Sequence, residues 1–331
     1  MDRVLSGMQP SGRLHIGNLV GALQNWIRLQ ERYECYYFVA DWHALTSQYA
    51  DTSQIRENTQ DMLINWLSAG LDPEKSTIFI QSWVPEHAEL HILLSMIIPI
   101  GWLERVPTYK EKQEEMKDKD LGTYGFLGYP VLQSADILIY KAKYVPVGID
   151  QMPHLEITRE ICRRFNFLYG EIFPEPEGLL SEFPKVPGID GRKMSKSYNN
   201  CIYLSDTPEE VKEKIKTMVT DPQRIRRTDK GNPELSPVYQ LHKIFSTKDE
   251  QDELAEGCRT AGIGCLDCKA ILIKNLFKVL EPIWSKRKSL LEKPDALKDI
   301  VHSGTEKARN VTIKTINEVK EAIRLFLLSN F

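Results

Sequence analysis

Short apolar segments alternate with segments of helical periodicity over the first half of the chain, and this alternation constrains the fold most strongly. Four segments have the length and composition of buried strands, namely residues 3–6, 35–40, 77–80 and 144–147. Apolar residues recur at helical spacing between and after them, from residue 15 onward, over 55–67 and over about 153–165. Strands and helices that alternate in this way predict a parallel sheet covered by helices on both faces.

The pattern changes in the second half of the chain. Pro and Gly interrupt residues 173–191, where we expect the sheet domain to end. Helical patterns then follow over 208–218, 270–288 and 305–326. A length of 331 residues suits two domains. We therefore predict an α/β domain over residues 1–200 and a smaller, all-helical domain over residues 201–331.

Composition narrows the class of protein without naming a function. The chain is 42% hydrophobic and 27% charged, which is typical of a folded globular protein, and its longest apolar stretches are too short to span a membrane. The start of the chain leaves no room for a targeting peptide, and six cysteines are too few for a disulfide-stabilised secreted domain. We expect a cytoplasmic protein without membrane contact. The net charge of −3 neither favours nor excludes a nucleic-acid partner.

The first candidate site follows the first strand, in a turn over residues 7–18 that reads GMQPSGRLHIGN. It opens the first helix, where free backbone N–H groups favour an anion. Gly17 lets a ligand approach the backbone closely, and His15 can donate to a phosphate oxygen. Taken alone, residues 15–18 are equally compatible with an ordinary helix start.

The second candidate site is the segment 193–197, which reads KMSKS and lies in a loop between the two predicted domains. Two lysines and two hydroxyls in such a loop can stabilise the charge on a triphosphate and on a leaving pyrophosphate. A short basic loop considered alone is usually only solvated.

Together, HIGN at 15–18 and KMSKS at 193–197 resemble the HIGH and KMSKS signatures of class I aminoacyl-tRNA synthetases. The resemblance implies a Rossmann-like catalytic domain, a helical domain that binds the tRNA anticodon, and the use of ATP with Mg²⁺. It also implies that an aminoacyl-adenylate forms first and then esterifies the 3′ end of the tRNA. His15, Asn18, Lys193 and Lys196 would take part in catalysis. The residues expected to bind ATP are Gln9, Pro10, Ser11, His15, Gly17, Asn18, Gly148, Ile149, Asp150, Val186, Lys193, Met194, Ser195, Lys196 and Ser197.

Further stretches are similar to the tryptophanyl members of that family, namely residues 8–12, 41–46, 129–138 and 145–151. The similarity runs from residue 3 to about 220. It implies tRNA(Trp) and L-tryptophan as substrates, and a homodimer. The apolar segment 90–102 is a candidate for the dimer interface and could equally be core.

Asp136 is the residue on which amino-acid specificity depends. It lies in an apolar segment, where a carboxylate is costly unless it is paired or hydrogen-bonded, and it shares one helix face with Tyr129, Gln133 and Tyr140. A buried acceptor suits the single N–H of indole, whereas a structural role would be pairing with a lysine or capping a helix. By resemblance, the tryptophan site comprises Asp136, Gln133, Tyr129, His43, Val145, Val147 and Gln151. Structural roles remain open for three of these, the two valines as core and His43 as a hydrogen-bonded histidine.

Gln133 is a departure from the tryptophanyl pattern, in which methionine is common at this position. Tyrosyl enzymes often place Gln near Asp in the corresponding helix, so a tyrosyl-tRNA synthetase is the alternative enzyme. A synthetase-like binding protein that does not aminoacylate tRNA is the alternative of another class.

Three clustered cysteines, Cys258, Cys265 and Cys268, have a spacing that could ligate zinc or an iron–sulfur cluster. A subset of bacterial tryptophanyl enzymes resembles this pattern and carries a fourth cysteine, at the position that Ser236 occupies here. The alternative is three reduced thiols. Nearby basic residues are candidates for tRNA backbone contacts: Arg224, Arg226, Arg227, Lys286, Arg287 and Lys288.

Overall fold

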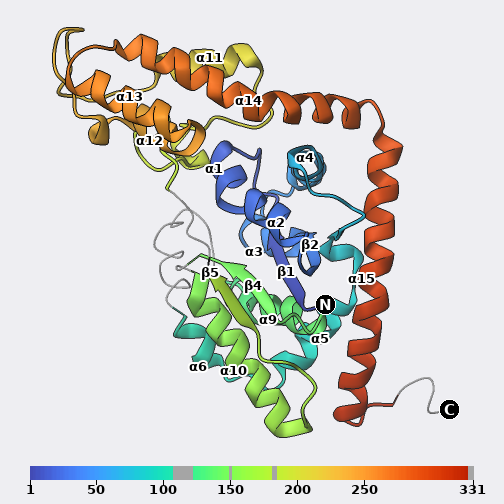
Figure 1. Ribbon diagram of the computed structural model, residues 1–331. Coiled ribbons are helices and arrows are strands. Elements are labelled where there is room, and N and C mark those ends of the chain that lie inside the picture. Colours follow the sequence, from blue (N-terminus) through green and yellow to red (C-terminus); the bar gives the residue numbers. More distant parts are fainter. Residues whose placement is uncertain (107–121, 149–150, 181–184, 327–331) are drawn as a thin grey trace.

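The computed structural model describes residues 1–106, 122–148, 151–180 and 185–326, and its strands form one parallel sheet in the order β3-β2-β1-β4-β5 (Figure 1). The predicted parallel sheet is therefore confirmed, and four of its strands lie where the sequence indicated. The strands are β1 (Arg3–Met8), β2 (Glu34–Val39), β3 (Ser76–Ile80), β4 (Tyr144–Val147) and β5 (Glu177–Leu180).

The fifth strand lies inside residues 173–191, where we expected the sheet domain to end, and the sequence analysis did not identify it. It is a short edge strand, and both of its end residues, Glu177 and Leu180, are exposed. A strand of this kind lacks the continuous apolar run that identified the other four, so the sequence pattern misses it.

The strand order contains a reversal that positions the ligand site. From β1 the chain moves outward to β2 and β3, then returns to the other side of β1 with β4 and moves outward again to β5. In open parallel sheets, ligands bind at the carboxyl ends of the strands next to such a reversal. The turn after β1 and Gly148 after β4 both lie at this edge.

Helices cover both faces of the sheet. One face packs against η1 (a π-helical segment, Leu19–Leu23), α2 and α4, and the other packs against α5, α9 and α10. The helices of this half are α1 (Ile16–Asn18), α2 (Gln24–Leu29), α3 (Asp41–Gln48), α4 (Ile55–Ala69), η2 (Gln81–Trp83), α5 (Glu86–Ser95), α6 (Ile100–Glu104), α8 (Tyr124–Leu127), α9 (Tyr129–Ile139) and α10 (Met152–Tyr169).

The described part after residue 200 is helical, as the sequence predicted. Its elements are α11 (Pro208–Thr217), η5 (Pro233–Leu235), α12 (Pro237–Phe245), α13 (Lys248–Arg259), α14 (Cys265–Leu291) and α15 (Pro294–Ala322), preceded by the short η4 (Lys196–Tyr198). Three of them, α11 to α13, gather with the start of α14 at one end of the molecule (Figure 1).

Two long helices join this part to the sheet. An ion pair of 2.6 Å between Arg287 and Asp61 links α14 to α4. Helix α15 then runs along β3, and a Cβ on Gly304 would lie 1.9 Å from the carbonyl oxygen of Ile78, so only glycine permits this approach. The division at residue 200 remains our proposal for the domain boundary. Among the described helices, none has both the length and the apolar character needed to cross a bilayer.

Candidate active site

An open cleft of about 300 Å³ lies at the carboxyl ends of β1 and β4. Its walls include Gln9 after β1, His43 after β2, and the cleft-facing side of α9. All seven residues expected to bind tryptophan line it: Tyr129, Gln133, Asp136, His43, Val145, Val147 and Gln151. The structure thus brings together residues that are more than a hundred positions apart in the sequence.

The Asp136 side chain is almost completely buried at 1% exposure, and it accepts hydrogen bonds from three side chains. The Nε2 atom of His43 lies 2.8 Å from Oδ2, and the Nδ1 atom of His87 lies 2.6 Å from Oδ1. The amide nitrogen of Gln81 lies 2.9 Å from each of the two oxygens. Asp136 neither pairs with a lysine nor caps a helix, which were the two structural roles considered for it.

These hydrogen bonds keep the carboxylate charged. Burial by itself would raise the pKa of Asp136, but the hydrogen bonds from His43 and His87 outweigh it and hold the pKa below its usual value. The cleft therefore presents a buried, ionised acceptor, which can take a hydrogen bond from a neutral donor of a ligand.

Gln81 and His87 were not identified from the sequence. Gln81 directly follows β3, and so it stands at the same sheet edge as the turn after β1 and the segment after β2. The sequence signal that could have identified Gln81 is a polar residue at the carboxyl end of a buried strand. His87 lies in the first turn of α5 and carries no comparable signal.

The two ATP motifs are joined by backbone pairing. The N–H of Ile16 donates to the carbonyl of Ile202 at 3.0 Å, and the N–H of Leu204 donates to the carbonyl of Leu14 at 2.8 Å. The segment that follows KMSKS therefore runs beside HIGN. Main-chain contacts thus hold together residues nearly two hundred positions apart, which side-chain patterns do not reveal.

The KMSKS loop is anchored by one buried residue, and of its two lysines one is exposed and the other is hydrogen-bonded. Met194 is buried at 4% exposure, and its N–H donates to the carbonyl of Val186 at 2.9 Å. Lys193 and Ser197 are exposed. The ammonium group of Lys196 lies 3.0 Å from the Gly12 carbonyl and 3.2 Å from the Ser11 carbonyl, in the turn after β1.

His15 begins the helical segment of the first motif, and its backbone N–H donates to the side-chain oxygen of Asn18 at 3.0 Å. Within the described residues its buried Nδ1 atom has no hydrogen-bond partner. Burial, and then the nearby charge of Lys196, lowers the pKa of His15 to about 4. A Cβ on Gly17 would lie 2.8 Å from this Nδ1, so glycine keeps the space beside the ring open.

Not all of the expected ATP residues can be placed. Gln9 lines the cleft, and Pro10 and Ser11 follow it in the same turn. Gly148 follows β4 at the same sheet edge, and Ser195 lies within the KMSKS loop. Ile149 and Asp150 lie outside the described residues. The roles expected for all of these residues remain predictions.

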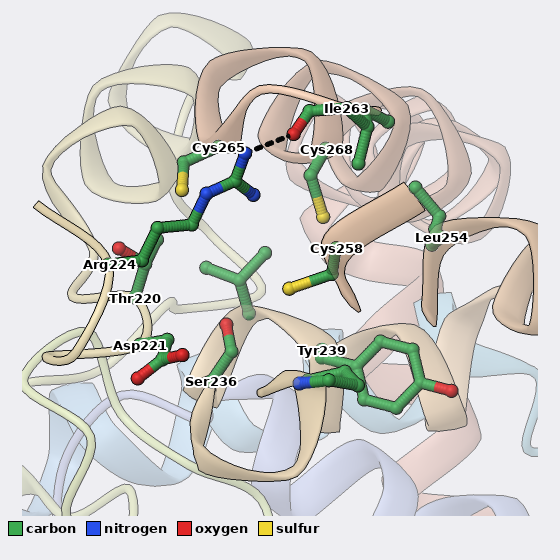
Figure 2. A pocket seen from close by; sticks show the side chains of 12 residues that line it. Thr220, Asp221, Arg224, Ser236, Tyr239, Leu254, Cys258, Ile263, Cys265 and Cys268 are labelled. Carbon is green, nitrogen blue, oxygen red and sulfur yellow. Dashed lines mark hydrogen bonds between the residues drawn. The ribbon is translucent and has the colours of Figure 1, made fainter. Parts of the chain in front are cut away.

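A second, small cavity, of about 20 Å³, lies at the cysteine cluster between α12, α13 and the start of α14. Figure 2 shows the side chains of Cys258, Cys265 and Cys268 around it, together with Ser236 and the long side chain of Arg224. Arg224 is buried at 8% exposure, and its Nη2 atom donates to the carbonyls of Arg227 and Ile263 at 2.8 and 2.6 Å.

This arrangement does not fit a metal or an iron–sulfur cluster. The fourth position holds the hydroxyl of Ser236, and the guanidinium cation of Arg224 lies among the thiols. Nowhere in the described ranges do three Cys, His, Asp or Glu side chains converge as a metal site requires. The burial of Arg224 also contradicts its suggested contact with a tRNA backbone. Arg287, another of those candidates, is already paired with Asp61.

The family described as tRNA synthetases class I (W and Y) matches residues 2–281. A tryptophan–tRNA ligase of Thermotoga maritima is 57% identical over 325 residues, which cover 98% of this chain and 99% of that protein. Another, of Aquifex aeolicus, is 44% identical over 98% of this chain and 100% of its own length.

Solved structures agree with these relatives. Tryptophanyl-tRNA synthetase from Campylobacter jejuni, complexed with ADP and tryptophan, superposes with a TM-score of 0.89 at 37% identity. The match covers 98% of this chain and 100% of that one. A tyrosyl-tRNA synthetase from Archaeoglobus fulgidus, with a TM-score of 0.65 and 23% identity, shares the fold.

His15 generates a prediction about stability. Because its pKa of about 4 in the folded protein lies below the ordinary value of 6.5, the unfolded chain binds a proton in this window that the folded chain does not. Stability should therefore fall as the pH drops from 6.5 to 4. The loss in the free energy of unfolding that His15 causes over this range is about 2–3 kcal/mol.

His15→Asn lacks this titration, so its free energy of unfolding by urea should fall less between pH 7 and 4.5 than that of the natural protein. His302→Asn, at an exposed position on α15, is the matched control. Equal pH slopes for His15→Asn and the natural protein would contradict the burial of a neutral His15.

Proposed function

We infer that this chain, which belongs to the class I tRNA synthetases for tryptophan and tyrosine, is a tryptophan–tRNA ligase. It activates L-tryptophan with ATP to tryptophanyl-adenylate and pyrophosphate, and then transfers tryptophan to the 3′ end of its tRNA. The observation that carries the choice of amino acid is the buried, ionised carboxylate of Asp136 in the cleft at the sheet reversal.

Asp136 is the proposed acceptor for the indole N–H. Indole has a single polar atom, which is a donor, and an ionised carboxylate is a matching acceptor in a site with little water. Phenylalanine would leave this acceptor without its ligand donor, which is the kind of mismatch that penalises a substrate analogue most strongly. In this proposal Val145 and Val147 flank the ring, while Tyr129, Gln133, His43 and Gln151 complete the amino-acid site.

The ATP side of the site is proposed to lie along the turn after β1 and the KMSKS loop. The exposed side chain of Lys193 is free to approach phosphate. Lys196 would exchange the carbonyls of Ser11 and Gly12 for phosphate oxygens when ATP enters. Positive charge near the leaving pyrophosphate and in-line placement of the tryptophan carboxylate would lower the barrier. His15, whose low pKa keeps its imidazole uncharged at neutral pH, would act there as a neutral hydrogen-bonding group with Asn18 beside it.

Mg²⁺ is proposed to enter with ATP. In the part of the chain that the structure describes, no cluster of carboxylates provides a dedicated cation site. Mg²⁺ keeps several waters and commonly binds through substrate phosphates, so the nucleotide itself would supply its main ligands.

The partners proposed for this chain are tRNA(Trp) and a second copy of the chain, in the cytoplasm. Exposed apolar side chains on α5 and α6 and at the start of α8 support the dimer, because such patches mark contact surfaces. They are Ile92, Met96, Ile100 and Tyr124, which are between 54% and 75% exposed. The helical part after residue 200 is the proposed anticodon-binding domain.

For the cysteine cluster we propose three reduced thiols without a metal. Protein purified anaerobically should be colourless, with no absorbance near 400 nm, and should contain iron and zinc far below one atom per chain. The physical reason is that Arg224 and Ser236 occupy the space and the ligand position that a fourth thiolate and a cluster would need. A brown protein, or stoichiometric zinc that survives dialysis, would contradict this proposal.

Amino-acid-dependent exchange of pyrophosphate into ATP tests the proposed function. Exchange should be supported by tryptophan and not by tyrosine or phenylalanine at matched concentrations. Exchange with tyrosine alone would establish the tyrosyl alternative that Gln133 suggested. No exchange with any of the three would favour a binding protein that has kept the fold.

A further inference from the structure

Behind Asp136, on the side away from the cleft, lies a pair of buried polar side chains that the proposed reaction has not yet used. His87 comes from the first turn of α5, and Tyr140 ends α9, four residues after Asp136. Both side chains have 0% exposure. The Nδ1 atom of His87 lies 2.6 Å from Oδ1 of Asp136, and its Nε2 atom lies 2.8 Å from the hydroxyl of Tyr140.

The hydrogen bonds that link Tyr140, His87 and Asp136 all point toward the carboxylate. An ionised Asp136 only accepts, so the Nδ1 atom of His87 must carry the proton that points toward it. The Nε2 atom of His87 faces the Tyr140 hydroxyl, and in the neutral tautomer it accepts a hydrogen bond from that hydroxyl. Burial raises the pKa of Tyr140 far above its ordinary value, which keeps this hydroxyl protonated. Each polar group in the sequence Tyr140, His87, Asp136 thereby has a hydrogen-bond partner.

Packing holds Tyr140 in place. Its ring centroid lies 4.8 Å from that of Tyr36 and 5.7 Å from that of Phe79, which come from two neighbouring strands. Its backbone carbonyl accepts from Arg3 at 3.0 Å. Because the ring cannot turn freely, the hydroxyl keeps a fixed position relative to the imidazole of His87.

The side of Asp136 that faces the cleft differs in how its donor is buried. Of the three donors to this carboxylate, His43 lines the cleft, whereas Gln81 and His87 are completely buried. The four contacts with these donors already fill the acceptor positions of a carboxylate. An incoming N–H must therefore take the place of one existing donor, and the donor that can withdraw into the cleft is His43 at Oδ2.

We propose that Tyr140 and His87 form a positioning relay that holds the Asp136 carboxylate by Oδ1, so that Oδ2 stays aligned toward the cleft and exchanges its bond to His43 for the indole N–H. This inference rests on the proposed role of Asp136 as the acceptor for indole. It adds two specificity-determining residues that touch neither tryptophan nor ATP.

The test compares tryptophan with an analogue that lacks the N–H, 3-(1-benzothiophen-3-yl)-L-alanine, in which sulfur replaces the indole nitrogen. The readout is kcat/KM for each substrate in ATP–pyrophosphate exchange. Tyr140→Phe removes one hydroxyl from the relay and should lower kcat/KM for tryptophan by roughly tenfold, the usual effect of losing one hydrogen bond that supports a charged acceptor. The value for the analogue should change less than about twofold, since that substrate makes no N–H bond to Asp136.

Tyr36→Phe is the matched control. It removes a hydroxyl from the adjoining aromatic ring, but that hydroxyl bonds to Glu34 at 2.6 Å and not to the relay. This variant should leave the ratio of the two substrates unchanged. Equal losses for both substrates in Tyr140→Phe would mean that Tyr140 only stabilises the fold, and would overturn the relay.

Asp136→Ala separates the relay from the proposed function on which it rests, because alanine has no acceptor for the indole N–H. If this variant keeps the natural preference for tryptophan over the analogue, Asp136 is not the indole acceptor and both proposals fail. If it loses the preference while Tyr140→Phe keeps it, the relay alone fails. Where both proposals hold, adding Tyr140→Phe to Asp136→Ala has no further effect on the substrate ratio.

A second pair of variants keeps the test usable if Tyr140→Phe does not fold. In His87→Asn, the amide nitrogen can stand near the position of Nδ1 and donate to Asp136, whereas His87→Leu has no donor. The Asn variant should retain more of the preference for tryptophan than the Leu variant. Equal preferences in these two variants would contradict a positioning role for His87.

Discussion

The rest of this structure depends on the hydrogen bonding of one carboxylate that is buried beside an open cleft. A buried charge without partners would cost several kcal/mol, on the order of 3–5 when a partner is removed from a buried pair. Asp136 avoids this cost through hydrogen-bond donors from three separate elements: His43 from α3, Gln81 from η2 and His87 from α5. Helix α3 follows β2, and η2 and α5 follow β3 in turn, so the strand order determines whether the donors can meet.

The same sheet edge explains how two distant motifs, HIGN and KMSKS, come to lie side by side. The turn after β1 and the KMSKS loop are joined by main-chain bonds between residues 14–16 and 202–204 and by the ammonium group of Lys196. Met194 is buried and anchors the loop, while Lys193 is exposed and Lys196 is hydrogen-bonded to the turn after β1. Backbone pairing therefore positions the loop, and in the proposed function the two lysine side chains would respond to the nucleotide.

Sequence patterns anticipated the parallel sheet, the helical second half and the members of the cleft, because buried strands and signature motifs depend on local residue order. They missed β5, whose edge position removes the continuous apolar run. They also missed His87, since nothing near it in the sequence shows that α5 packs against α9 behind Asp136. Arg224 was taken for a surface residue because a run of arginines usually is one, but it is buried against the carbonyls of Arg227 and Ile263.

The cysteine cluster and the cleft illustrate opposite uses of buried polar groups. Around the cysteines, a guanidinium group and a serine hydroxyl replace the arrangement that a metal would need. In the cleft, one acceptor is kept ionised and, in the proposed function, directed toward the ligand.

The most direct test of the role of Asp136 is the proton resonance of the indole N–H in bound tryptophan, labelled with nitrogen-15 in the ring. A hydrogen bond to the ionised Asp136 predicts a resonance well downfield of free tryptophan, slow exchange with water, and loss of both effects in Asp136→Ala. A resonance that matches free tryptophan and exchanges as quickly would contradict the account.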